Sequence, residues 1–329
     1  MRFTFWGVRG SIPAPGKSTV KYGGNTSCIE IYVEDRDQVV ILDAGTGIRE
    51  LGNDLLTRFK PGSLSCNIFL THTHWDHVQG FPFFMPAFIE GNNFNIYGPT
   101  SGTSNGGQKA NLQLKDLFIE QMRYQYFPVK LDEMKAKSQF VEIKEGKYDI
   151  DGISITVKNL NHPILCLGYR FSFGSMGDLT YCTDSEPYMN YFLSNVNNIP
   201  EDMFDSSVYE KLKSKINDPI SIEKLNLCLQ ENLNIINFCK GSRVLIYDSQ
   251  YMRDEYIKKM SWGHSRVDDA VSIACKAGVE KLFLFHHDPT RSDGAVEDML
   301  AYAREIAVSR FKNREIKIEA AAEGLAVEF

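Results

Sequence analysis

Short apolar runs set the hydrophobic pattern of the first part of the chain. Residues 2–6, 28–33, 38–42 and 67–70 are apolar or alternate between apolar and polar positions, which is typical of buried and half-buried β-strands. In residues 48–59 the apolar side chains recur at helical spacing, which predicts an amphipathic helix. The pattern therefore predicts strands joined by a helix from the first residues onward.

Similar segments continue to the end of the chain. The predicted strands are again short and rich in β-branched and aromatic residues. We predict further strands at residues 95–97, 139–143, 153–159, 167–173, 176–182, 243–247, 281–285 and 316–319. We predict further helices at residues 77–87, 112–126 and 294–311, and one that opens within residues 261–267 and runs to residue 277.

The composition changes between residues 186 and 240. Helical runs rich in asparagine, aspartate, glutamate and lysine replace the strands there, among them residues 208–216 and 222–238. We therefore divide the chain into a main domain, residues 1–185 and 241–329, and an inserted helical subdomain, residues 186–240. Apolar positions of the insert could pack either on the main domain or on a second copy of the chain in a homodimer. These positions are Leu225, Leu229, Leu233 and Ile236.

Three segments are rich in small residues. Residues 7–13 and 22–28 are glycine-rich, and glycine permits positive φ and close backbone approach. Two interpretations remain open for them: a loop over a functional site, in which Arg9 or Asn25 contacts substrate, or plain turn chemistry between two strands. Residues 98–111 are rich in glycine, serine, asparagine and threonine, which predicts a mobile loop that could act as a lid.

Composition and charge limit the classes of protein. With 43% hydrophobic and 24% charged residues among 329, the chain has the composition of a globular protein with a substantial core. Its net charge of −6 disfavours a nucleic-acid polymer as the main partner, because such binding needs a cationic field, but permits a small anionic substrate. The seven cysteines include no C-x-x-C pair, and we find no export signal and no apolar run that could span a bilayer. We therefore expect a soluble, cytoplasmic protein without membrane contact.

Candidate chemistry is concentrated directly after the strand at residues 67–70. His72, His74, Asp76 and His77 fall within six positions. Alternate residues of an extended chain point the same way, so the first two histidines can aim at one point and the last two residues at a second point nearby. Imidazole nitrogens and carboxylate oxygens are ligands of Zn²⁺, and Mn²⁺ or Fe²⁺ accept the same set. The segment predicts a metal site, with ordinary surface or core histidines as the alternative.

The pattern His72-x-His74-x-Asp76-His77 after an apolar strand resembles the signature of the metallo-β-lactamase fold hydrolases. Other landmarks of that family follow predicted strands between residues 1 and about 319, with one stretch that the resemblance does not cover. These landmarks are Asp43, His162, Asp184 and His286. The resemblance implies an α/β fold, arranged as a four-layer α/β/β/α sandwich with the helical insert. It also implies two divalent metal ions, Zn²⁺ first and Mn²⁺ or Fe²⁺ as alternatives.

The family pattern implies a role for each of these residues. The ligands of one ion would be His72, His74 and His162, those of the other Asp76, His77 and His286, with Asp184 bridging the two ions. Asp43 would support the histidines by hydrogen bonds, although it could equally cap the turn before the helix at residues 48–59. An aspartate at position 184, where zinc β-lactamases carry cysteine, resembles the glyoxalase II-like, lactonase and tRNase Z or cyclic-nucleotide phosphodiesterase branches.

A further pair of residues resembles the tRNase Z-like phosphodiesterase branch. In that branch an acidic residue after a strand orients a histidine at the start of a helix, and here these are Asp248 and His264. Such a histidine can protonate a leaving alkoxide. A helix-terminal histidine without a catalytic role is the alternative, and Arg266 departs from the His-Ser-Thr that the branch often has. Asp76 is a catalytic candidate as well as a ligand.

The resemblance also implies a reaction. Two ions lower the pKa of a bridging water from about 15.7 toward 7, and the resulting hydroxide would attack phosphorus with His264 as general acid. The opening Gly7-Val8-Arg9-Gly10-Ser11 and the closing His286-His287-Asp288-Pro289 look like bacterial 3′,5′-cyclic-nucleotide phosphodiesterases. Hydrolysis of such a small anionic phosphodiester is the leading hypothesis, with His287 as a substrate-binding candidate. The alternatives are a tRNA 3′-processing endonuclease, a metallo-hydrolase of a non-phosphate ester or lactone, and a metal-binding sensor without turnover.

Overall fold

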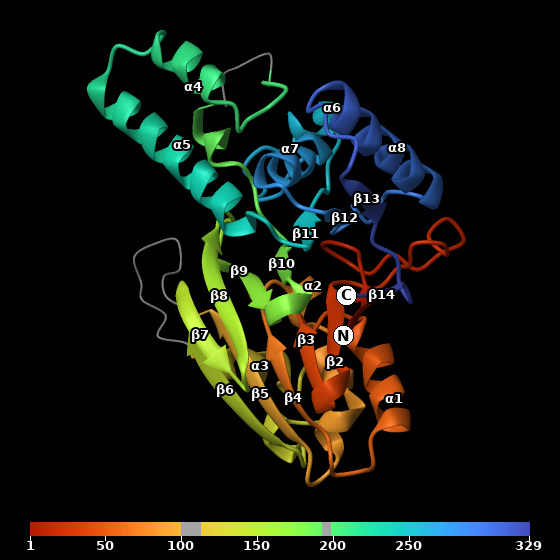
Figure 1. Cartoon of the computed structure of the whole chain (residues 1–329). Coiled ribbons are helices and arrows are strands. Elements are labelled where there is room, and N and C mark those ends of the chain that lie inside the picture. Colours follow the sequence, from red (N-terminus) through yellow and green to blue (C-terminus); the bar gives the residue numbers. More distant parts are fainter. Residues whose placement is uncertain (100–112, 193–198) are drawn as a thin grey trace. The chain divides into compact units, whose positions relative to one another are not determined.

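A computed structural model describes residues 1–99, 113–192 and 199–329 and divides the chain into two compact units. Each unit has one seven-stranded mixed sheet and a hydrophobic core of its own (Figure 1). The first unit comprises Met1–Glu145, Asp288–Asp293 and Ala321–Phe329, and the second comprises Gly146–His287 and Gly294–Ala320. Most of the lid loop predicted at residues 98–111 lies outside the described residues.

The sheet of the first unit starts as an antiparallel meander and continues with parallel strands. Strands β14, β1, β2 and β3 pair antiparallel, and β3 to β6 pair parallel. The strands are, in sheet order, β14 (Ala326–Glu328), β1 (Arg2–Gly7), β2 (Cys28–Val33), β3 (Gln38–Leu42), β4 (Ser65–Phe69), β5 (Asn93–Pro99) and β6 (Lys137–Ile143). The helices are α1 (Ile48–Arg58), α2 (Trp75–Val78) and α3 (Leu114–Gln121), with the 3₁₀-helices η1 (Glu34–Arg36), η2 (Phe81–Phe83), η3 (Met85–Phe88) and η4 (Leu131–Glu133).

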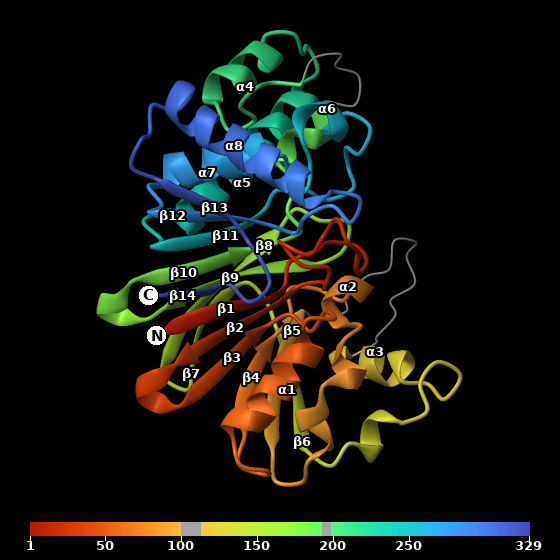
Figure 2. The ribbon, with the colours of Figure 1, turned by 90° about the vertical axis from the view of Figure 1, so that its right-hand side faces the viewer.

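Helix α1 shows why these elements form a core. Its apolar residues Ile48, Leu51 and Leu55 recur at helical spacing and are all buried. Figure 2 shows the helix lying along one face of the sheet. Strand β4 is buried from its second residue onward, as expected for a strand inside a parallel sheet that a helix covers.

The sheet of the second unit also changes from antiparallel to parallel pairing. Strands β7 to β10 pair antiparallel, and β10 to β13 pair parallel. The strands are β7 (Gly146–Ile150), β8 (Ile153–Leu160), β9 (Cys166–Ser172), β10 (Asp178–Cys182), β11 (Val244–Asp248), β12 (Lys281–Phe285) and β13 (Lys317–Ala320). The helices are α4 (Ser206–Lys213), α5 (Pro219–Cys239), α6 (Arg253–Tyr256), α7 (Val267–Ala277) and α8 (Asp293–Ser309), with the 3₁₀-helices η5 (Gly174–Met176) and η6 (Tyr188–Phe192).

The parallel strands position most of the candidate residues. Parallel strands end at the same edge of a sheet, so side chains that follow them come close together. In the first unit Asp43 follows β3 and His72 lies three residues after β4. In the second unit Asp184 follows β10, Asp248 ends β11 and His286 follows β12. Each sheet therefore gathers its own set of candidate residues at one edge.

The α/β class predicted from the sequence is confirmed, and one predicted helix is wrong. Residues 77–87 do not form a helix: α2 ends at Val78, and η2 and η3 follow. Pro82 and Pro86 stand in the first turns of η2 and η3. Proline fits a first turn but cannot continue a preceding helix, so the chain restarts at each proline.

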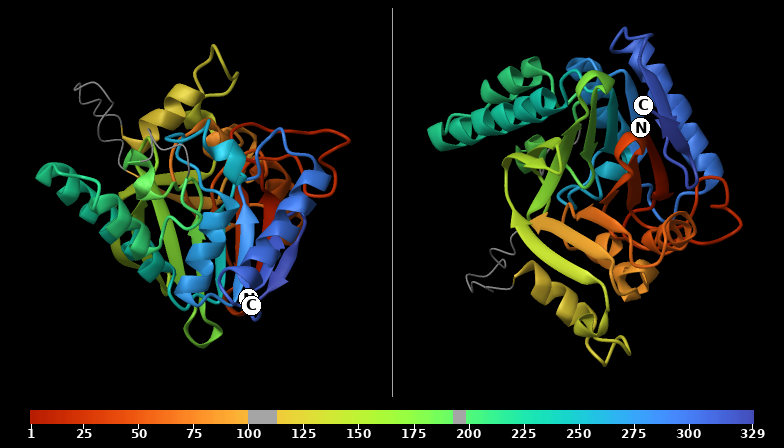
Figure 3. Two further views of the ribbon diagram at one scale, coloured as in Figure 1. Left: turned by 90° about the horizontal axis from the view of Figure 1, so that it is seen from above. Right: turned by 60° about the horizontal axis from the view of Figure 1, so that its bottom comes forward.

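The predicted insert contains α4 and α5, and its division from the main domain stays a prediction. Figure 3 shows the two helices side by side. Leu225 and Ile236 of α5 are buried in the core of the second unit, and Leu229 packs against that core. Leu233 is 39% exposed. This packing favours the interpretation in which the insert stabilises its own chain, and the homodimer stays a prediction.

None of the helices in the described ranges has the length and hydropathy needed to cross a membrane.

Candidate functional site

The first unit gathers His72, His74, Asp76 and His77 at the end of β4, as predicted. His74 precedes the first residue of α2, and Asp76 and His77 lie within that helix. The ring centroid of His72 lies 4.7 Å from that of His74 and 4.2 Å from that of His77. The Nε2 atom of His77 lies 3.3 Å from Oδ2 of Asp76. Except for the half-buried His74, these side chains are buried, so their donor atoms face one another rather than bulk water.

Asp43 orients the segment from His72 to His77 through hydrogen bonds to Thr71 and a contact with His77. Its Oδ1 accepts hydrogen bonds from the backbone N–H of Thr71 at 2.8 Å and from the Thr71 hydroxyl at 3.0 Å. Its Oδ2 lies 2.9 Å from Nδ1 of His77. Helix α1 begins after Gly47 without a side-chain cap, so Asp43 does not cap it. A carboxylate that holds Nδ1 leaves Nε2 as the ligand nitrogen and fixes the ring, which is how metal-binding histidines are commonly oriented.

The second unit gathers His162, Asp184 and His286. Oδ1 of Asp184 lies 3.2 Å from Nε2 of His286, and Oδ2 lies 3.8 Å from Nε2 of His162. The other ring nitrogen of His162, Nδ1, lies 3.0 Å from the carbonyl oxygen of Gly263. Oδ2 lies equally far, 3.8 Å, from Nδ1 of His264. The two oxygens of one carboxylate thus face different histidines, an arrangement suited to a carboxylate shared by two ions about 3.5–4 Å apart.

Three of these residues have left-handed backbones. The φ angles are +59° at Asp43, +51° at Asp184 and +63° at His286. Aspartate and histidine enter this region more often than most residues, but a non-glycine residue there still costs on the order of 1 kcal/mol. Each residue comes just after a parallel strand, where the unusual turn redirects its side chain. The sequence signals the strand ends but not these backbone conformations.

His264 and Asp248 form the predicted pair in the second unit. Nδ1 of His264 lies 2.8 Å from Oδ2 of Asp248, which is fully buried. The backbone N–H groups of Ser185 and Gln250 also donate to this carboxylate, at 3.2 and 3.1 Å. The His264 ring stacks on His286 with 4.9 Å between centroids. Ligand atoms of Asp248, His264 and His286 lie within 4.8 Å of one another, so His264 has the surroundings of either an acid or a further metal ligand.

Glu186 is a site residue that the sequence reasoning missed. It is 2% exposed and accepts hydrogen bonds from the Tyr256 hydroxyl and from the backbone N–H groups of Ser261, at 2.8 Å, and Gly263, at 3.1 Å. The loop that it holds ends at His264 and offers the Gly263 carbonyl to His162. Burial raises the pKa of Glu186, although the hydrogen bonds oppose that rise. An acid two residues after a predicted ligand was the only sequence signal.

Arg9 is committed to backbone carbonyl groups. Its side chain is fully buried. Nε donates to the carbonyl oxygen of Gly23 at 2.8 Å, and Nη1 donates to those of Asp288 at 3.2 Å and Arg291 at 2.7 Å. Burial lowers the pKa of this guanidinium. These contacts favour the structural interpretation of Arg9 that the sequence left open.

The first glycine-rich loop nevertheless contacts the segment from His72 to His77, which holds the first four predicted ligands. The backbone N–H of Ser11 donates to Oδ2 of Asp76 at 2.6 Å, so the first loop folds against a predicted ligand. Asn25 donates from Nδ2 to Oε2 of Glu323 at 3.0 Å, which again favours a structural role. His287 is fully buried, and its predicted substrate contact stays a prediction.

The donor chemistry of both sets fits divalent metal ions. The first unit offers three imidazoles and a carboxylate, and the second offers two imidazoles and a carboxylate, all with short contacts among them. Neutral imidazole and carboxylate are the ligands that zinc and similar ions take. These clusters are therefore suited to divalent metal ions.

A cavity of about 490 Å³ adjoins the metal-binding segment in the first unit. Thr73 and Trp75, which alternate with the ligands in the sequence, line it together with aromatic residues from later in the chain. Trp75 is 76% exposed. The aromatic members of the lining are Trp75, Phe83, Phe118, Tyr126 and Phe127.

Comparison with known proteins gives the family and the fold. The beta-lactamase superfamily domain matches residues 38–221, more than half of the chain. Ribonuclease Z of Bacillus cereus is 24% identical over 333 residues, which cover 96% of each chain. The metallo-beta-lactamase fold protein YhfI from Bacillus subtilis has a TM-score of 0.60 at 17% identity, covering 100% of this chain and 98% of that one. Yeast PDE1 has a TM-score of 0.59 at 13% identity, covering 100% and 99%.

Proposed function

Because the chain belongs to the beta-lactamase superfamily, we propose that it uses two divalent ions to hydrolyse a small phosphodiester, in first place a 3′,5′-cyclic nucleotide. The family establishes that the protein is a metallo-β-lactamase fold hydrolase, and its His/Asp clusters are suited to metal ions. The nuclearity of the site and the nature of the substrate are the proposal.

The residues of both units would hold the ions. One ion would take His72, His74 and His162, the other Asp76, His77 and His286, and Asp184 would be shared. When bound, two such ions supply a water molecule of lowered pKa and positive charge beside the substrate phosphate. Zn²⁺ suits this nitrogen-rich set best, and Mn²⁺ or Fe²⁺ can use it too.

The chain's own part in catalysis centres on His264. Asp248 holds Nδ1 of the ring at 2.8 Å, so proton exchange with a substrate is confined to Nε2. Asp248 in turn is fixed by two backbone N–H groups. From Nε2 a proton can pass to the leaving alkoxide oxygen, a step that a thiolate or a stable enolate leaving group does not need.

The histidine–aspartate pair is the single observation that carries the phosphodiester assignment. A thioester gains little from an acid because its thiolate leaves without a proton, whereas an alkoxide leaving from phosphorus needs one. The aromatic cavity beside Trp75 supports a substrate with a flat base, because bases stack on exposed aromatic rings. Its volume of about 490 Å³ suits one small ligand.

tRNA 3′-end processing is the second candidate. The relative from Bacillus cereus is named Ribonuclease Z, and the match covers 96% of both chains. The net charge of −6 argues against this candidate, because binding of an RNA polymer is driven by phosphate contacts with lysine and arginine.

Substrate profiling separates these candidates. The purified protein, loaded with Zn²⁺ or Mn²⁺, is given bis(p-nitrophenyl) phosphate, 3′,5′-cAMP, 2′,3′-cyclic nucleotides, a tRNA precursor, and a lactone with a simple carboxylic ester. We expect cleavage of the model diester and of a 3′,5′-cyclic nucleotide. Cleavage of the tRNA precursor alone would transfer the assignment to the ribonuclease class. Turnover of the lactone or ester alone would overturn phosphorus chemistry altogether.

A further inference from the structure

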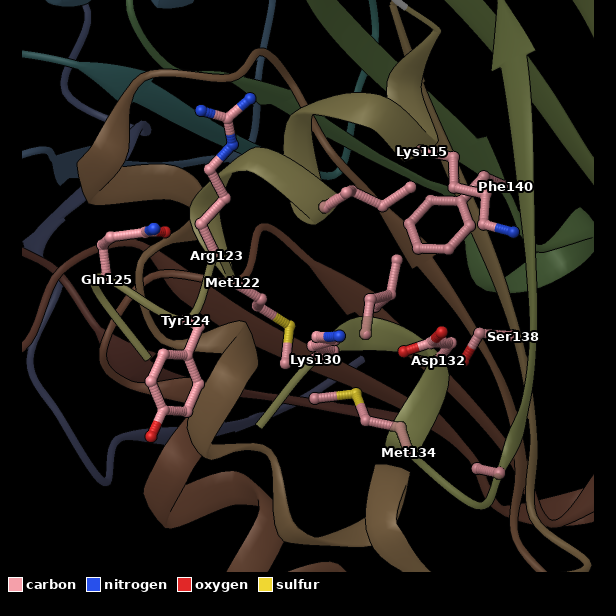
Figure 4. A pocket seen from close by; sticks show the side chains of 13 residues that line it. Lys115, Met122, Arg123, Tyr124, Gln125, Lys130, Asp132, Met134, Ser138 and Phe140 are labelled. Atoms are coloured by element: carbon pink, nitrogen blue, oxygen red, sulfur yellow. The ribbon is translucent and has the colours of Figure 1, made fainter. Parts of the chain in front are cut away.

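The first unit contains a second cavity, of about 680 Å³, which none of the predicted metal ligands lines. Its volume lies within the range of pockets that take small organic ligands. Figure 4 shows its side chains converging from α3, from the segment that follows α3, and from β6. The residues that line it are Lys115, Ile119, Met122, Arg123, Tyr124, Gln125, Lys130, Leu131, Asp132, Met134, Ala136, Ser138 and Phe140.

The floor of this cavity is apolar and adaptable. Met122, Leu131 and Met134 are at most 9% exposed, so they form the deep part of the lining. Figure 4 shows the Met122 and Met134 side chains directed toward the middle of the cavity, with the Phe140 ring on one side. Methionine has an unbranched, polarisable side chain that adjusts to ligands of different shape. The floor therefore suits an apolar chain or a flat ring.

The charged side chains of the lining favour an anion. Lys115, Arg123 and Lys130 carry positive charge, and Asp132 is the only carboxylate among the lining residues. Arg123 already pairs with Glu120. Among the described residues, neither lysine has a carboxylate partner within ion-pair distance. Two lysines against one aspartate leave a net positive charge above an apolar floor.

We propose that this cavity binds a small amphipathic organic anion, whose acidic head lies beside Lys115 and Lys130 and whose apolar body lies on Met122, Met134 and Phe140. An organic cation would face two lysines and one carboxylate, so like-charge repulsion disfavours it. A strongly polar anion such as inorganic phosphate would leave the apolar floor without a partner. The ligand class follows from this pairing of charge with apolar surface.

Decanoate is a suitable probe, because it joins one carboxylate to a flexible apolar chain. Binding is measured on the metal-loaded full chain by titration calorimetry, and by displacement of the fluorescent anion 1-anilinonaphthalene-8-sulfonate. Decyltrimethylammonium, with a similar chain and the opposite charge, serves as the matched control ligand. We expect decanoate to bind and to displace the fluorescent anion, and the cationic analogue to do neither below its micelle concentration.

Three variants localise the binding. Lys130→Gln removes one charge-assisted contact, so decanoate should bind roughly tenfold more weakly. Ser138→Leu places a larger apolar side chain from β6 into the cavity and should abolish binding. The backbone hydrogen bonds of β6 should be unchanged. Lys147→Gln is the matched control, because Lys147 is an exposed lysine on β7 in the second unit, away from the cavity. This variant should bind decanoate like the parent chain. Thermal melting verifies that each variant is folded.

Three results would overturn the proposal. The first is equal binding of decanoate and decyltrimethylammonium, which would mean that the charges of the lining do not select the ligand. The second is unchanged decanoate affinity in folded Ser138→Leu. The third is no binding of decanoate to the parent chain up to about 1 mM, where the binding free energy is near −4 kcal/mol. None of these results depends on hydrolytic activity, so the proposal can fail independently of the proposed function.

Discussion

Replacing Glu186 by glutamine perturbs the loop that presents His264 without changing the size of the side chain. Besides the side chain of Asn190, the carboxylate receives three donors, the Tyr256 hydroxyl and the backbone N–H groups of Ser261 and Gly263. An amide has one oxygen, and its NH₂ group cannot accept. At least one of the three buried donors therefore loses its acceptor in Glu186→Gln.

Two opposing terms set the size of the effect. An unsatisfied buried donor costs about 1–3 kcal/mol, and the remaining bonds lose the charge of their acceptor, about 1 kcal/mol more. Against this, the glutamine avoids the desolvation that raises the pKa of Glu186. We expect the hydrogen bonds to outweigh desolvation, with a net loss of about 1–3 kcal/mol in unfolding free energy.

Chemical denaturation and steady-state kinetics test this prediction together. The loop orients His264 and His162 and does not contact substrate. For each 1.4 kcal/mol by which the substitution destabilises the loop conformation that presents His264, kcat should therefore fall about tenfold, with little change in KM. Glu201→Gln is the matched control, since its side chain is 66% exposed and pairs only at the surface. It should change the unfolding free energy by less than about 0.5 kcal/mol. A Glu186→Gln protein as stable as the parent, with unchanged kcat, would refute the reasoning.

Three further predictions follow from the described side chains. Trp75→Ala should raise KM for a cyclic nucleotide about 5- to 150-fold, the cost of one lost stacking contact. Trp262→Ala, at a similarly exposed tryptophan, is the control and should leave KM unchanged. Equal KM values in both variants would show that the base does not bind in the cavity beside Trp75. His264→Ala should lower kcat about 10²- to 10⁴-fold while metal content by mass spectrometry stays that of the parent, and loss of metal would make His264 a ligand instead of an acid. Burial raises the pKa of Cys275 to about 11 from its ordinary value of 9.0, so at pH 8 its thiolate fraction is about 100-fold smaller than that of an unshifted thiol. The rate of Cys275 alkylation by iodoacetamide in the folded protein should be lower in proportion and should rise about tenfold per pH unit up to pH 10. Labelling as fast as in the guanidine-unfolded chain would contradict the raised pKa.

The gathering of candidate ligands between His72 and His77 could be predicted because it is local in the sequence. His72 to His77 are neighbours in sequence, and the apolar strand before them fixes where they begin. Strand β3 was predicted with its observed bounds and helix α7 with its observed last residue for the same reason, since the apolar residues of each are contiguous or periodic in the local sequence. Local signals of this kind do not depend on tertiary contacts.

The contacts of Glu186 could not be predicted because they are not local. Its partners Tyr256, Ser261 and Gly263 lie 70 to 77 residues away in the chain. Nothing in the sequence around Glu186 indicates that three donors converge on it. The same holds for Arg9, whose carbonyl partners Asp288 and Arg291 are 279 and 282 residues distant.

The helix predicted at residues 77–87 failed for a different reason. Two prolines, at positions 82 and 86, lie inside the predicted range, and neither can continue a preceding helix. The aromatic side chains are nevertheless used: Phe81 and Phe84 are fully buried, so 3₁₀-turns deliver them to the core as a helix would have done. The burial of these two phenylalanines therefore does not require a helical backbone.

Metal content measured against a single substitution tests the central claim most directly. The native protein, isolated under metal-replete conditions and dialysed, should carry about two equivalents of divalent metal per chain by plasma mass spectrometry. Asp184→Asn should carry at most about one equivalent while remaining folded, because an amide cannot be shared as an anion between two ions. A native protein without bound metal, or an Asp184→Asn variant that retains two equivalents, would contradict a shared carboxylate at the centre of a dinuclear site.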